Sequence, residues 1–328
     1  MKPSRIVVRA PNWIGDAVMS LGAVRDLRRR NFPEARIEIL ARPWVADLYA
    51  TVPEVDAVRH AVGFREDVTV LRGAFDAALL LPNSFGTALQ AFAAGIPERW
   101  GYATDGRGPL LTRRARVPRS ALRASSEVYY YRAMLAGLGL EVSAAPDVSL
   151  RPPDDWKARG AEILGSAGPW IGIGAGASFG SAKQWIPERF AAVAEQARRR
   201  SGAQVAVLGG ASERPLGEAI AACLGSRALV LCGETTLPEL IGVLSHLELF
   251  LTNDSGPMHL ASAQGVPVVA VFGPTDWRET APVGAPHRVV REEVECAPCK
   301  LRECPIDHRC MKLVTIDRVL GAVDEVLA

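Results

Sequence analysis

The sequence predicts an α/β protein built from two parallel-sheet domains. Short apolar runs of strand length alternate with helical patterns along most of the chain, which is typical of parallel strands joined by helices on both faces of a sheet. The chain has 328 residues, which is long enough for two domains. A proline-rich stretch at 141–155 has no clear period and is the best linker candidate. We therefore predict domains at 1–150 and 151–328.

The composition is that of a soluble globular protein, with 48% hydrophobic and 23% charged residues. The net charge of +2 argues against a dedicated nucleic-acid binder. Residues 1–150 hold 20 Lys and Arg against 15 Asp and Glu, and this more basic half suits an anionic partner. No signal peptide and no apolar run of membrane-spanning length is visible. We expect a cytoplasmic protein with at most peripheral membrane contact.

The first predicted strand, 5–9, leads through a loop into an amphipathic helix, and two residues at the helix entrance are site candidates. Gly15 allows a ligand to approach the backbone closely. The helix dipole favours the ionised carboxylate of Asp16, which is the state that a general base needs. A helix N-cap is the structural alternative for Asp16.

The first half then repeats the alternation of strand and helix. Residues 95–101 are expected to form a turn into a further strand. The other expected strands are 36–41, 57–60 and 75–81, and the expected helices are 45–50, 87–94 and 128–138.

An arginine cluster interrupts this rhythm, among glycines and prolines that indicate a loop. Guanidinium groups can bind phosphates through paired hydrogen bonds, and a solvated basic loop is the alternative. The cluster consists of Arg107, Arg113, Arg114, Arg116, Arg119 and Arg123.

The second half begins with a predicted strand at 170–174 and a loop of small residues that ends in Lys183. Such a loop can lie against a diphosphate while Lys183 neutralises it, although a lysine with a structural role is equally compatible. Gly172, Gly174 and Ala177 formally match a dinucleotide-binding pattern. The next predicted helix starts near Pro187, too late for these residues to open it.

The following units continue the alternation, with a helix at 187–201 and strands at 204–208 and 229–232. Glu213 follows a strand end, where carboxylates often bind ribose hydroxyls, and first-turn helix stabilisation is its alternative role. Thr235 precedes a helix at 237–244, for which Thr236 and Glu239 form a predicted capping box.

A strand, a polar turn, a helix and a second strand follow at 249–275, and the chain is organised around this stretch. Its turn lies where a parallel strand ends and a helix begins, which is where open α/β sheets bind ligands. A capped helix start with a surface histidine is the alternative. The candidate residues are Asp254, Ser255, Gly256 and His259.

A cysteine-rich loop at about 295–311 lies between a predicted strand at 287–291 and a closing helix at 316–327. The first two cysteines have the spacing of a zinc knuckle, so a structural metal and reduced thiols are both compatible with the sequence. The candidate ligands are Cys296, Cys299, Cys304 and Cys310, with His308 as a fifth.

Several separated motifs together resemble the bacterial ADP-heptose:lipopolysaccharide heptosyltransferases, and most closely heptosyltransferase II. They span nearly the whole chain in family order, and the cysteine segment completes them. Pro257 stands where the family usually carries Leu, and residues 183–187 lengthen the common Lys-x-Trp-Pro motif by one residue. The motifs are 11–17 (PNWIGDA), 82–85 (PNSF), 95–102 (GIPERWGY), 174–185 (GAGASFGSAKQW), 252–259 (TNDSGPMH) and 272–276 (FGPTD).

This resemblance implies a GT-B fold, two Rossmann-like domains facing across a cleft, with the acceptor on the first domain and ADP-heptose on the second. It implies inverting transfer of L-glycero-D-manno-heptose to the lipopolysaccharide inner core at the cytoplasmic face of the inner membrane. A Kdo–lipid A-type heptosylated acceptor is expected. No catalytic cofactor is expected, because no Asp-x-Asp metal motif occurs; a structural zinc ion is the possible exception.

The resemblance also implies residue roles. Asp16 is expected to be the general base, and Lys183 to stabilise the leaving ADP. The basic region is expected to bind the acceptor through Arg113, Arg114 and Arg116. The residues expected to bind substrate are Gly15, Ser178, Glu213, Thr235, Asp254, Ser255, Gly256 and His259.

Three alternatives stay open at this point. A heptosyltransferase of the I or III type would use a different core acceptor. A nicotinamide-dependent oxidoreductase would need the Gly172 loop to open a helix directly. A non-catalytic module would bind nucleotide or metal without transfer.

Overall fold

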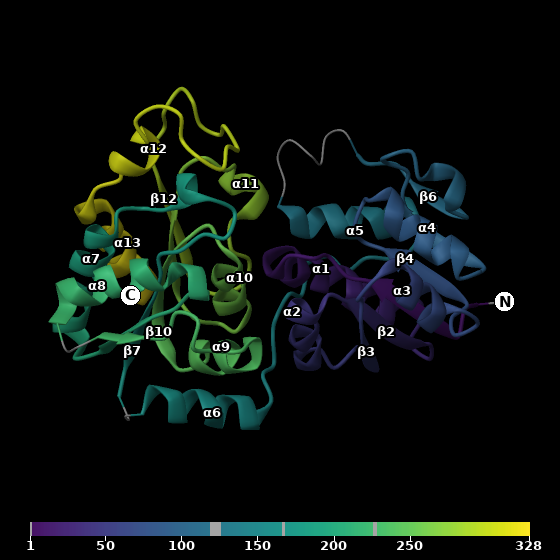
Figure 1. Cartoon of the computed structure of the whole chain (residues 1–328), viewed down its shortest axis with the longest axis horizontal. Coiled ribbons are helices and arrows are strands. Elements are labelled where there is room, and N and C mark those ends of the chain that lie inside the picture. The colour runs from purple at the N-terminus through teal and green to yellow at the C-terminus, as the bar shows by residue number, and fades with distance from the viewer. Residues whose placement is uncertain (1, 119–125, 166–167, 226–227) are drawn as a thin grey trace. The chain divides into compact units, whose positions relative to one another are not determined.

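The computed structural model describes residues 2–118, 126–165, 168–225 and 228–328. The chain divides into two compact units, Met1–Val148 and Ser149–Ala328. The described part of each unit holds a six-stranded sheet in which neighbouring strands are parallel (Figure 1). The predicted fold class, parallel α/β in two parts, is therefore confirmed.

The first unit has the strand order β3-β2-β1-β4-β5-β6. The order reverses between β1 and β4, and open sheets bind ligands at the carboxyl ends of strands at such a point. The strands are β1 (Arg5–Arg9), β2 (Arg36–Ala41), β3 (Ala57–His60), β4 (Ala77–Leu80), β5 (Glu98–Tyr102) and β6 (Arg113–Ala115). The helices are α1 (Ile14–Asp26), α2 (Pro43–Ala46), α3 (Phe64–Leu71), α4 (Phe85–Ala93) and α5 (Glu127–Gly137).

The second unit has the strand order β12-β11-β10-β7-β8-β9, which reverses between β7 and β10. The loops after these two strands therefore lie next to each other. The strands are β7 (Trp170–Gly174), β8 (Gln204–Val207), β9 (Ala228–Val230), β10 (Leu247–Asn253), β11 (Val268–Phe272) and β12 (His287–Arg291). The helices are α6 (Asp154–Leu164), α7 (Pro187–Ser201), α8 (Arg214–Leu224), α9 (Leu237–Leu244), α10 (Gly256–Ala263), α11 (Trp277–Thr280), α12 (Arg309–Lys312) and α13 (Ile316–Leu327).

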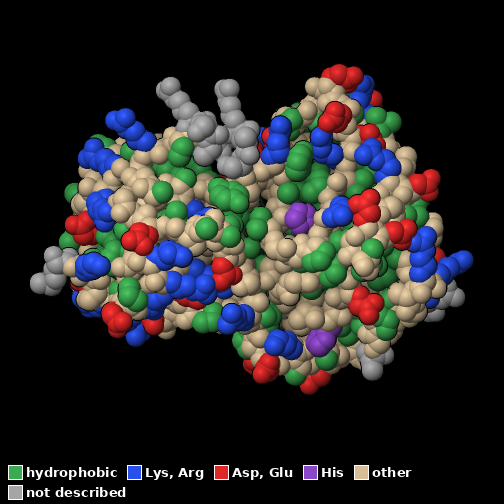
Figure 2. Space-filling view, turned by 180° about the vertical axis from the view of Figure 1, so that it is seen from behind, with side chains coloured by type: hydrophobic (Ala, Val, Ile, Leu, Met, Phe, Trp, Pro, Cys, Tyr) green, Lys and Arg blue, Asp and Glu red, His purple; other side chains and the backbone are tan. Residues whose placement is uncertain are grey.

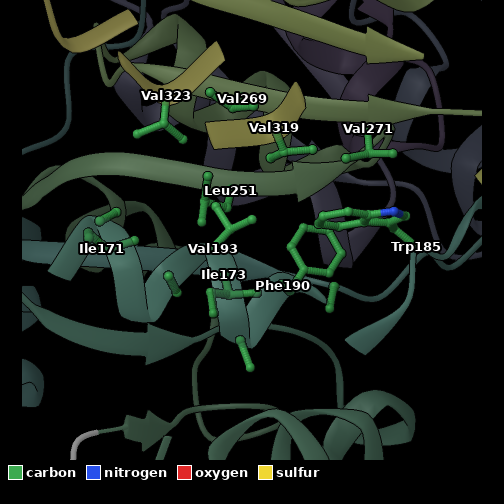
Figure 3. Close-up of a cluster of buried hydrophobic side chains, with 14 of the residues drawn as sticks. Ile171, Ile173, Trp185, Phe190, Val193, Leu251, Val269, Val271, Val319 and Val323 are labelled. Carbon is green, nitrogen blue, oxygen red and sulfur yellow. The ribbon is translucent and has the colours of Figure 1, made fainter. Parts of the chain in front are cut away.

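The core of the second unit fills the space between the sheet and helices α7 and α13 (Figure 3). Apolar side chains from β7, β10 and β11 meet those of the two helices there. The Trp185 ring packs edge-on against Phe190 with the ring centroids 4.9 Å apart. Trp185 also donates from Nε1 to the Val314 carbonyl at 3.1 Å. The loop that carries Lys183 is thereby anchored in the core two residues after that lysine.

The sequence-based prediction missed helices α3, α6, α11 and α12, and strand β6, which lies within the arginine-rich stretch expected to be a loop. Helix α3 has three charged side chains and two β-branched valines within eight residues, so its apolar pattern is short. Helix α6 begins inside the stretch predicted as linker, at Asp154 after two prolines. The helix expected at 45–50 instead begins at Pro43 and continues as a 3₁₀ turn, Asp47–Thr51.

Helix α6 packs against α9 through two glycines at very short range. A Cβ added to Gly242 would lie 2.0 Å from the Trp156 carbonyl oxygen, and one added to Gly160 would lie 2.2 Å from the Gly242 carbonyl carbon. Both contacts are to backbone atoms, so a side chain at either glycine would fit only if one helix moved as a whole. The missing side chains therefore set the distance between the two helices.

Gly242→Ala is expected to destabilise the protein by about 3 kcal/mol, because the added methyl group must force α6 and α9 apart. Urea unfolding measures this change in the free energy of unfolding. Gly321→Ala is the matched control, because a Cβ at Gly321 in α13 meets nothing within 4 Å. The control should be neutral or stabilising by up to about 1 kcal/mol. Equal stability of Gly242→Ala and wild type would contradict the close contact.

Among the described residues, no helix combines the length and the apolar character that crossing a bilayer requires.

Candidate functional site

An ion pair between Lys183 and Asp254 lies at the switch point of the second sheet. The Lys183 Nζ donates to Asp254 Oδ2 at 2.7 Å, and the two side chains are only 12% and 5% exposed. The hydroxyls of Thr275 and Thr280 donate to the same oxygen at 2.7 and 3.3 Å. The carboxylate is thus held by three donors, and one of them is the ammonium group expected at a diphosphate.

The side chain of Asn253 joins the loop after β7, which carries Lys183, to the turn after β10, which carries Asp254. Thr252 pairs with Gly174 in the β10–β7 ladder, so the chain leaves both strands side by side. The Asn253 amide then accepts from Trp185 N at 3.0 Å and donates to the Ala175 carbonyl at 2.5 Å. The chain just after Lys183 is therefore fixed to the end of β10, next to Asp254.

His259 lies one turn into α10, and only 5% of it is exposed. Burial lowers the pKa of His259 to about 4; the Asp254 carboxylate opposes this shift and the Lys183 ammonium adds to it. The ring is therefore neutral near pH 7 and offers hydrogen bonds rather than a charge. The alternative of a surface histidine is wrong.

The start of α10 also differs from a side-chain-capped helix. Ser255 occupies the N-cap position, but its side chain makes no cap hydrogen bond. The Ser255 hydroxyl instead lies 3.1 Å from the Thr252 hydroxyl. The backbone N–H groups that follow, beginning at Gly256, are therefore not capped by the Ser255 side chain.

The remaining candidates of the second unit lie on loops after β7, β8 and β9. Glu213 accepts from Gly210 N at 2.7 Å, and a Cβ at Gly176 would lie 2.0 Å from its carboxyl carbon. Gly176 thus lets this carboxylate lie against the loop after β7. Thr235 is half-buried and Ser178 is exposed.

In the first unit, Asp16 is the third residue of α1. Trp13 occupies the N-cap position without a side-chain cap, so the N-cap alternative for Asp16 is wrong. Asp16 is half-buried, as is Gly15 beside it. Burial raises the pKa of the Tyr49 and Tyr131 phenols, and the Asp16 carboxylate adds to both shifts, so both rings lie near it.

Sequence reasoning missed Arg9, which holds the loop before Asp16. Arg9 ends β1, is 5% exposed, and donates to the Leu40 carbonyl at 3.3 Å and to Asn12 Oδ1 at 2.8 Å. Trp44 Nε1 donates to the Asn12 carbonyl at 2.8 Å. A charged residue at the end of a buried strand was the signal that could have identified it.

The described arginines of the cluster lie in different environments. Arg107 is fully buried and donates to the carbonyls of Tyr102, at 2.8 Å, and Pro82, so its inclusion in the cluster was wrong. Burial lowers the pKa of Arg107 to about 10.

The three arginines predicted to bind the acceptor lie on or just after β6. Arg113 donates to the Leu138 carbonyl, and its guanidinium carbon lies 5.1 Å from the Trp100 ring centroid. Arg114 and Arg116 are exposed. Arg119 and Arg123 fall outside the described residues.

The four clustered cysteines are free thiols in different environments. Cys296 and Cys299 are exposed, Cys304 is half-buried, and Cys310 is buried. Burial raises the pKa of the Cys310 thiol to about 11. Within the described ranges, no group of three or more His, Cys, Asp or Glu side chains is placed to hold a metal ion. The predicted ligand set is thus not assembled as a site.

The oxidoreductase alternative fails on the geometry of the glycine loop. Strand β7 ends at Gly174, but α7 begins only at Pro187, after a 3₁₀ turn at Ser181–Lys183. The loop therefore does not open a helix directly, as a dinucleotide fingerprint requires.

Comparisons with known proteins agree on one family. The family model for glycosyltransferase family 9 (heptosyltransferase) matches residues 67–309. The chain is 32% identical over 307 residues to lipopolysaccharide heptosyltransferase 2 of Salmonella typhimurium, with 88% of each chain covered. The structure of E. coli ADP-heptose lipopolysaccharide heptosyltransferase II matches with a TM-score of 0.85 and 29% identity, covering 98% of both chains.

An E. coli heptosyltransferase solved with ADP shares the fold, with a TM-score of 0.76 and 17% identity over 98% of this chain and 99% of that one. The two parallel-sheet units are therefore those of a GT-B enzyme. The chain belongs to glycosyltransferase family 9, the heptosyltransferases.

Proposed function

We propose that this protein transfers L-glycero-D-manno-heptose from ADP-heptose to the lipopolysaccharide inner core, adding the second heptose. The observation that carries the proposal is the Lys183–Asp254 pair at the switch point of the second sheet. An ammonium group and the start of a helix converge there, as a nucleoside diphosphate requires. The relatives named heptosyltransferase 2 support the choice of sugar and acceptor.

In the proposed reaction, the acceptor hydroxyl attacks the anomeric carbon of the heptose and the configuration inverts. The Asp16 carboxylate takes the hydroxyl proton as the new C–O bond forms. The bond from the anomeric carbon to the β-phosphate oxygen breaks, and ADP leaves with that electron pair. Lys183 turns from Asp254 to the diphosphate and stabilises its growing negative charge.

The remaining substrate-binding roles follow the loops on which these residues lie. Glu213 and Thr235 are proposed for the nucleoside and Ser178 for the diphosphate. Asp254, Ser255, Gly256 and His259 are proposed for the diphosphate–sugar end, where the neutral His259 ring can donate or accept a hydrogen bond. Gly15 is proposed to leave room for the acceptor beside Asp16.

For the acceptor we propose a Kdo–lipid A-type heptosylated molecule, with Arg113, Arg114 and Arg116 as its anion-binding groups. The exposure of the last two supports this role. A transfer assay tests both sugar and acceptor: ADP release and the product mass are followed with ADP-heptose and core acceptors carrying no heptose, one heptose or two. Turnover on the singly heptosylated acceptor is expected. A preference for either of the others would indicate the type I or III reaction, and no turnover would contradict the proposal.

We further propose peripheral contact with the cytoplasmic face of the inner membrane. Trp13 and Trp44 follow the carboxyl ends of β1 and β2 and are each 58% exposed, and the Arg42 guanidinium carbon lies 5.9 Å from the Trp44 ring centroid. Exposed tryptophan beside a cation suits a lipid interface. On the face in Figure 2, apolar side chains lie among basic and acidic ones. Trp44→Ala should weaken sedimentation with anionic lipid vesicles; sedimentation equal to that of the wild type would contradict this contact.

A structural zinc ion at Cys296, Cys299, Cys304 and Cys310 is also proposed. The spacing of the first pair supports it, and the other three thiols add to the raised pKa of Cys310, which indicates that they lie near it. Binding would require the exposed thiols to close around the ion. Mass spectrometry of protein purified without chelator should find about one zinc per chain, lost in Cys310→Ser and kept in Cys223→Ser. Metal-free, fully active protein would contradict this proposal.

A further inference from the structure

The cysteine-rich segment, residues 295–311, contacts the loop after β7, which carries Lys183, and the loop after β11, whose Thr275 donates to Asp254. The Lys300 N–H donates to the Pro274 carbonyl at 2.8 Å, one residue before Thr275. The Arg302 carbonyl accepts from Ala182 N at 3.0 Å, one residue before Lys183. No residue of this segment has a role in the proposed reaction. Its backbone nevertheless contacts the chain next to Thr275 and next to Lys183.

His308 makes the second contact to Ala182. Its Nε2 lies 2.8 Å from the Ala182 carbonyl oxygen, so in the tautomer with a proton on Nε2 the ring donates to that carbonyl. Ala182 is 2% exposed, and its N–H and its carbonyl are both held by the cysteine-rich segment. The backbone immediately before Lys183 is thereby fixed from one direction by two hydrogen bonds.

The segment approaches this loop more closely than a side chain would permit. A Cβ added to Gly180 would lie 2.2 Å from the Arg302 carbonyl oxygen, and Gly180 has a φ of +156°. The Arg302 guanidinium carbon lies 5.4 Å from the Phe179 ring centroid, and Lys183 Nζ lies 4.9 Å from the same ring. The segment therefore supports the lysine through its backbone and through the aromatic ring beside its ammonium group.

The conformation of His308 is costly and is held from within the segment. Its φ of +61° is in the left-handed region, which is unfavourable for a residue with a side chain. The His308 N–H donates to Cys304 Sγ at 3.3 Å, and its carbonyl accepts from the N–H groups of Met311 and Lys312, the last two residues of α12. These contacts direct the imidazole towards Ala182.

We propose that His308 is a positioning residue that holds Lys183 ready for the diphosphate of the donor. This inference rests on the proposed function, in which Lys183 binds that diphosphate. A lysine side chain loses considerable rotamer freedom on binding, and a fixed backbone at Ala182 reduces the number of positions its ammonium group must search. His308 acts only through Lys183, so its contribution to ADP binding must depend on that lysine.

The test is a double-mutant cycle on the full chain, with the affinity for ADP measured by calorimetry. His308→Asn removes the ring nitrogen but keeps a residue that tolerates the left-handed conformation. It is expected to weaken ADP binding up to about tenfold, which is the upper end of what one neutral hydrogen bond contributes. In a Lys183→Met background the same change is expected to have no further effect. A merely structural role would instead add to the loss from Lys183→Met.

His246→Asn is the matched control, because its Nε2 also lies 2.8 Å from a backbone carbonyl oxygen, that of Lys157 in α6. It should leave ADP affinity unchanged. His308→Gln, which can again present a donor, should recover part of the loss. Gly180→Ala would press against the Arg302 carbonyl and so disturb the other hydrogen bond of the segment to Ala182. It should also weaken ADP binding, and it tests the support of Lys183 by the segment if His308→Asn does not fold.

The outcomes separate this inference from the proposed function. If Lys183→Met binds ADP as wild type does, the role of Lys183 fails and the inference fails with it. If Lys183→Met binds weakly but His308→Asn binds like wild type, or its effect adds fully, only the role of His308 is overturned. Weak binding by both single variants with no further loss in the double variant supports it.

Discussion

Asp16→Asn is expected to lower kcat for heptose transfer about a thousandfold while leaving the affinity for ADP unchanged. The amide keeps the size of the side chain but cannot take the proton of the acceptor hydroxyl. Asp16 lies in the first unit, whereas Lys183, Asp254 and His259 lie in the second, so donor binding should not depend on it. Steady-state rates of ADP release and calorimetric titration with ADP measure the two quantities.

Asp154→Asn is the control for this change. Asp154 is also an acidic residue in the first turn of a helix, α6, and its side chain is almost fully exposed. Each substitution removes one carboxylate from a helix N-terminus, which costs up to about 1 kcal/mol of stability. Only the change at residue 16 should reduce turnover. Wild-type turnover in Asp16→Asn would remove the general-base assignment, and loss of ADP affinity would indicate a different role.

Lys183→Met is expected to lower kcat/KM at least a hundredfold and to weaken ADP binding about tenfold or more. Methionine retains the length and the apolar stem of lysine but has no charge to neutralise the diphosphate. The substitution also leaves the Asp254 carboxylate with two hydroxyl donors instead of three. Since the negative charge on the leaving group grows during the reaction, turnover should fall more than binding does.

Lys157→Met provides the matched control for the lysine. Lys157 forms a surface ion pair with Asp154 at 3.0 Å, and pairs of this kind contribute at most about 1 kcal/mol. This variant should keep wild-type kinetics. If Lys183→Met kept them as well, the leaving group would have to be stabilised elsewhere in the second unit.

Most of the fold could be predicted because each element carries its own pattern. Strand β12 and helix α13 have the predicted bounds, and Thr236 and Glu239 form the predicted capping box. The elements that escaped prediction depend on their neighbours. Helix α6 is stabilised against α9 by the contact between Gly160 and Gly242, which no local pattern records.

The positions of the candidate residues at strand ends were predictable, but their arrangement in space was not. Lys183 and Asp254 could each be placed at a strand end, but their ion pair requires β7 and β10 to be neighbours in the sheet. The same holds for His308, which appeared in the sequence as a candidate metal ligand and in the structure binds the Ala182 carbonyl. Arg107 was wrongly grouped with a basic loop. Its side chain is buried and donates to backbone carbonyls.

A crystal structure with a non-reactive ADP-heptose analogue and an acceptor tests the central claim most directly. The diphosphate should contact Lys183 and the first residues of α10, and an Asp16 carboxylate oxygen should lie about 3 Å from the acceptor hydroxyl. Such a structure would show both units engaged on one reacting sugar. Asp16 and Asp254 opening onto separate surfaces, with the sugar bound at only one of them, would contradict the proposed reaction.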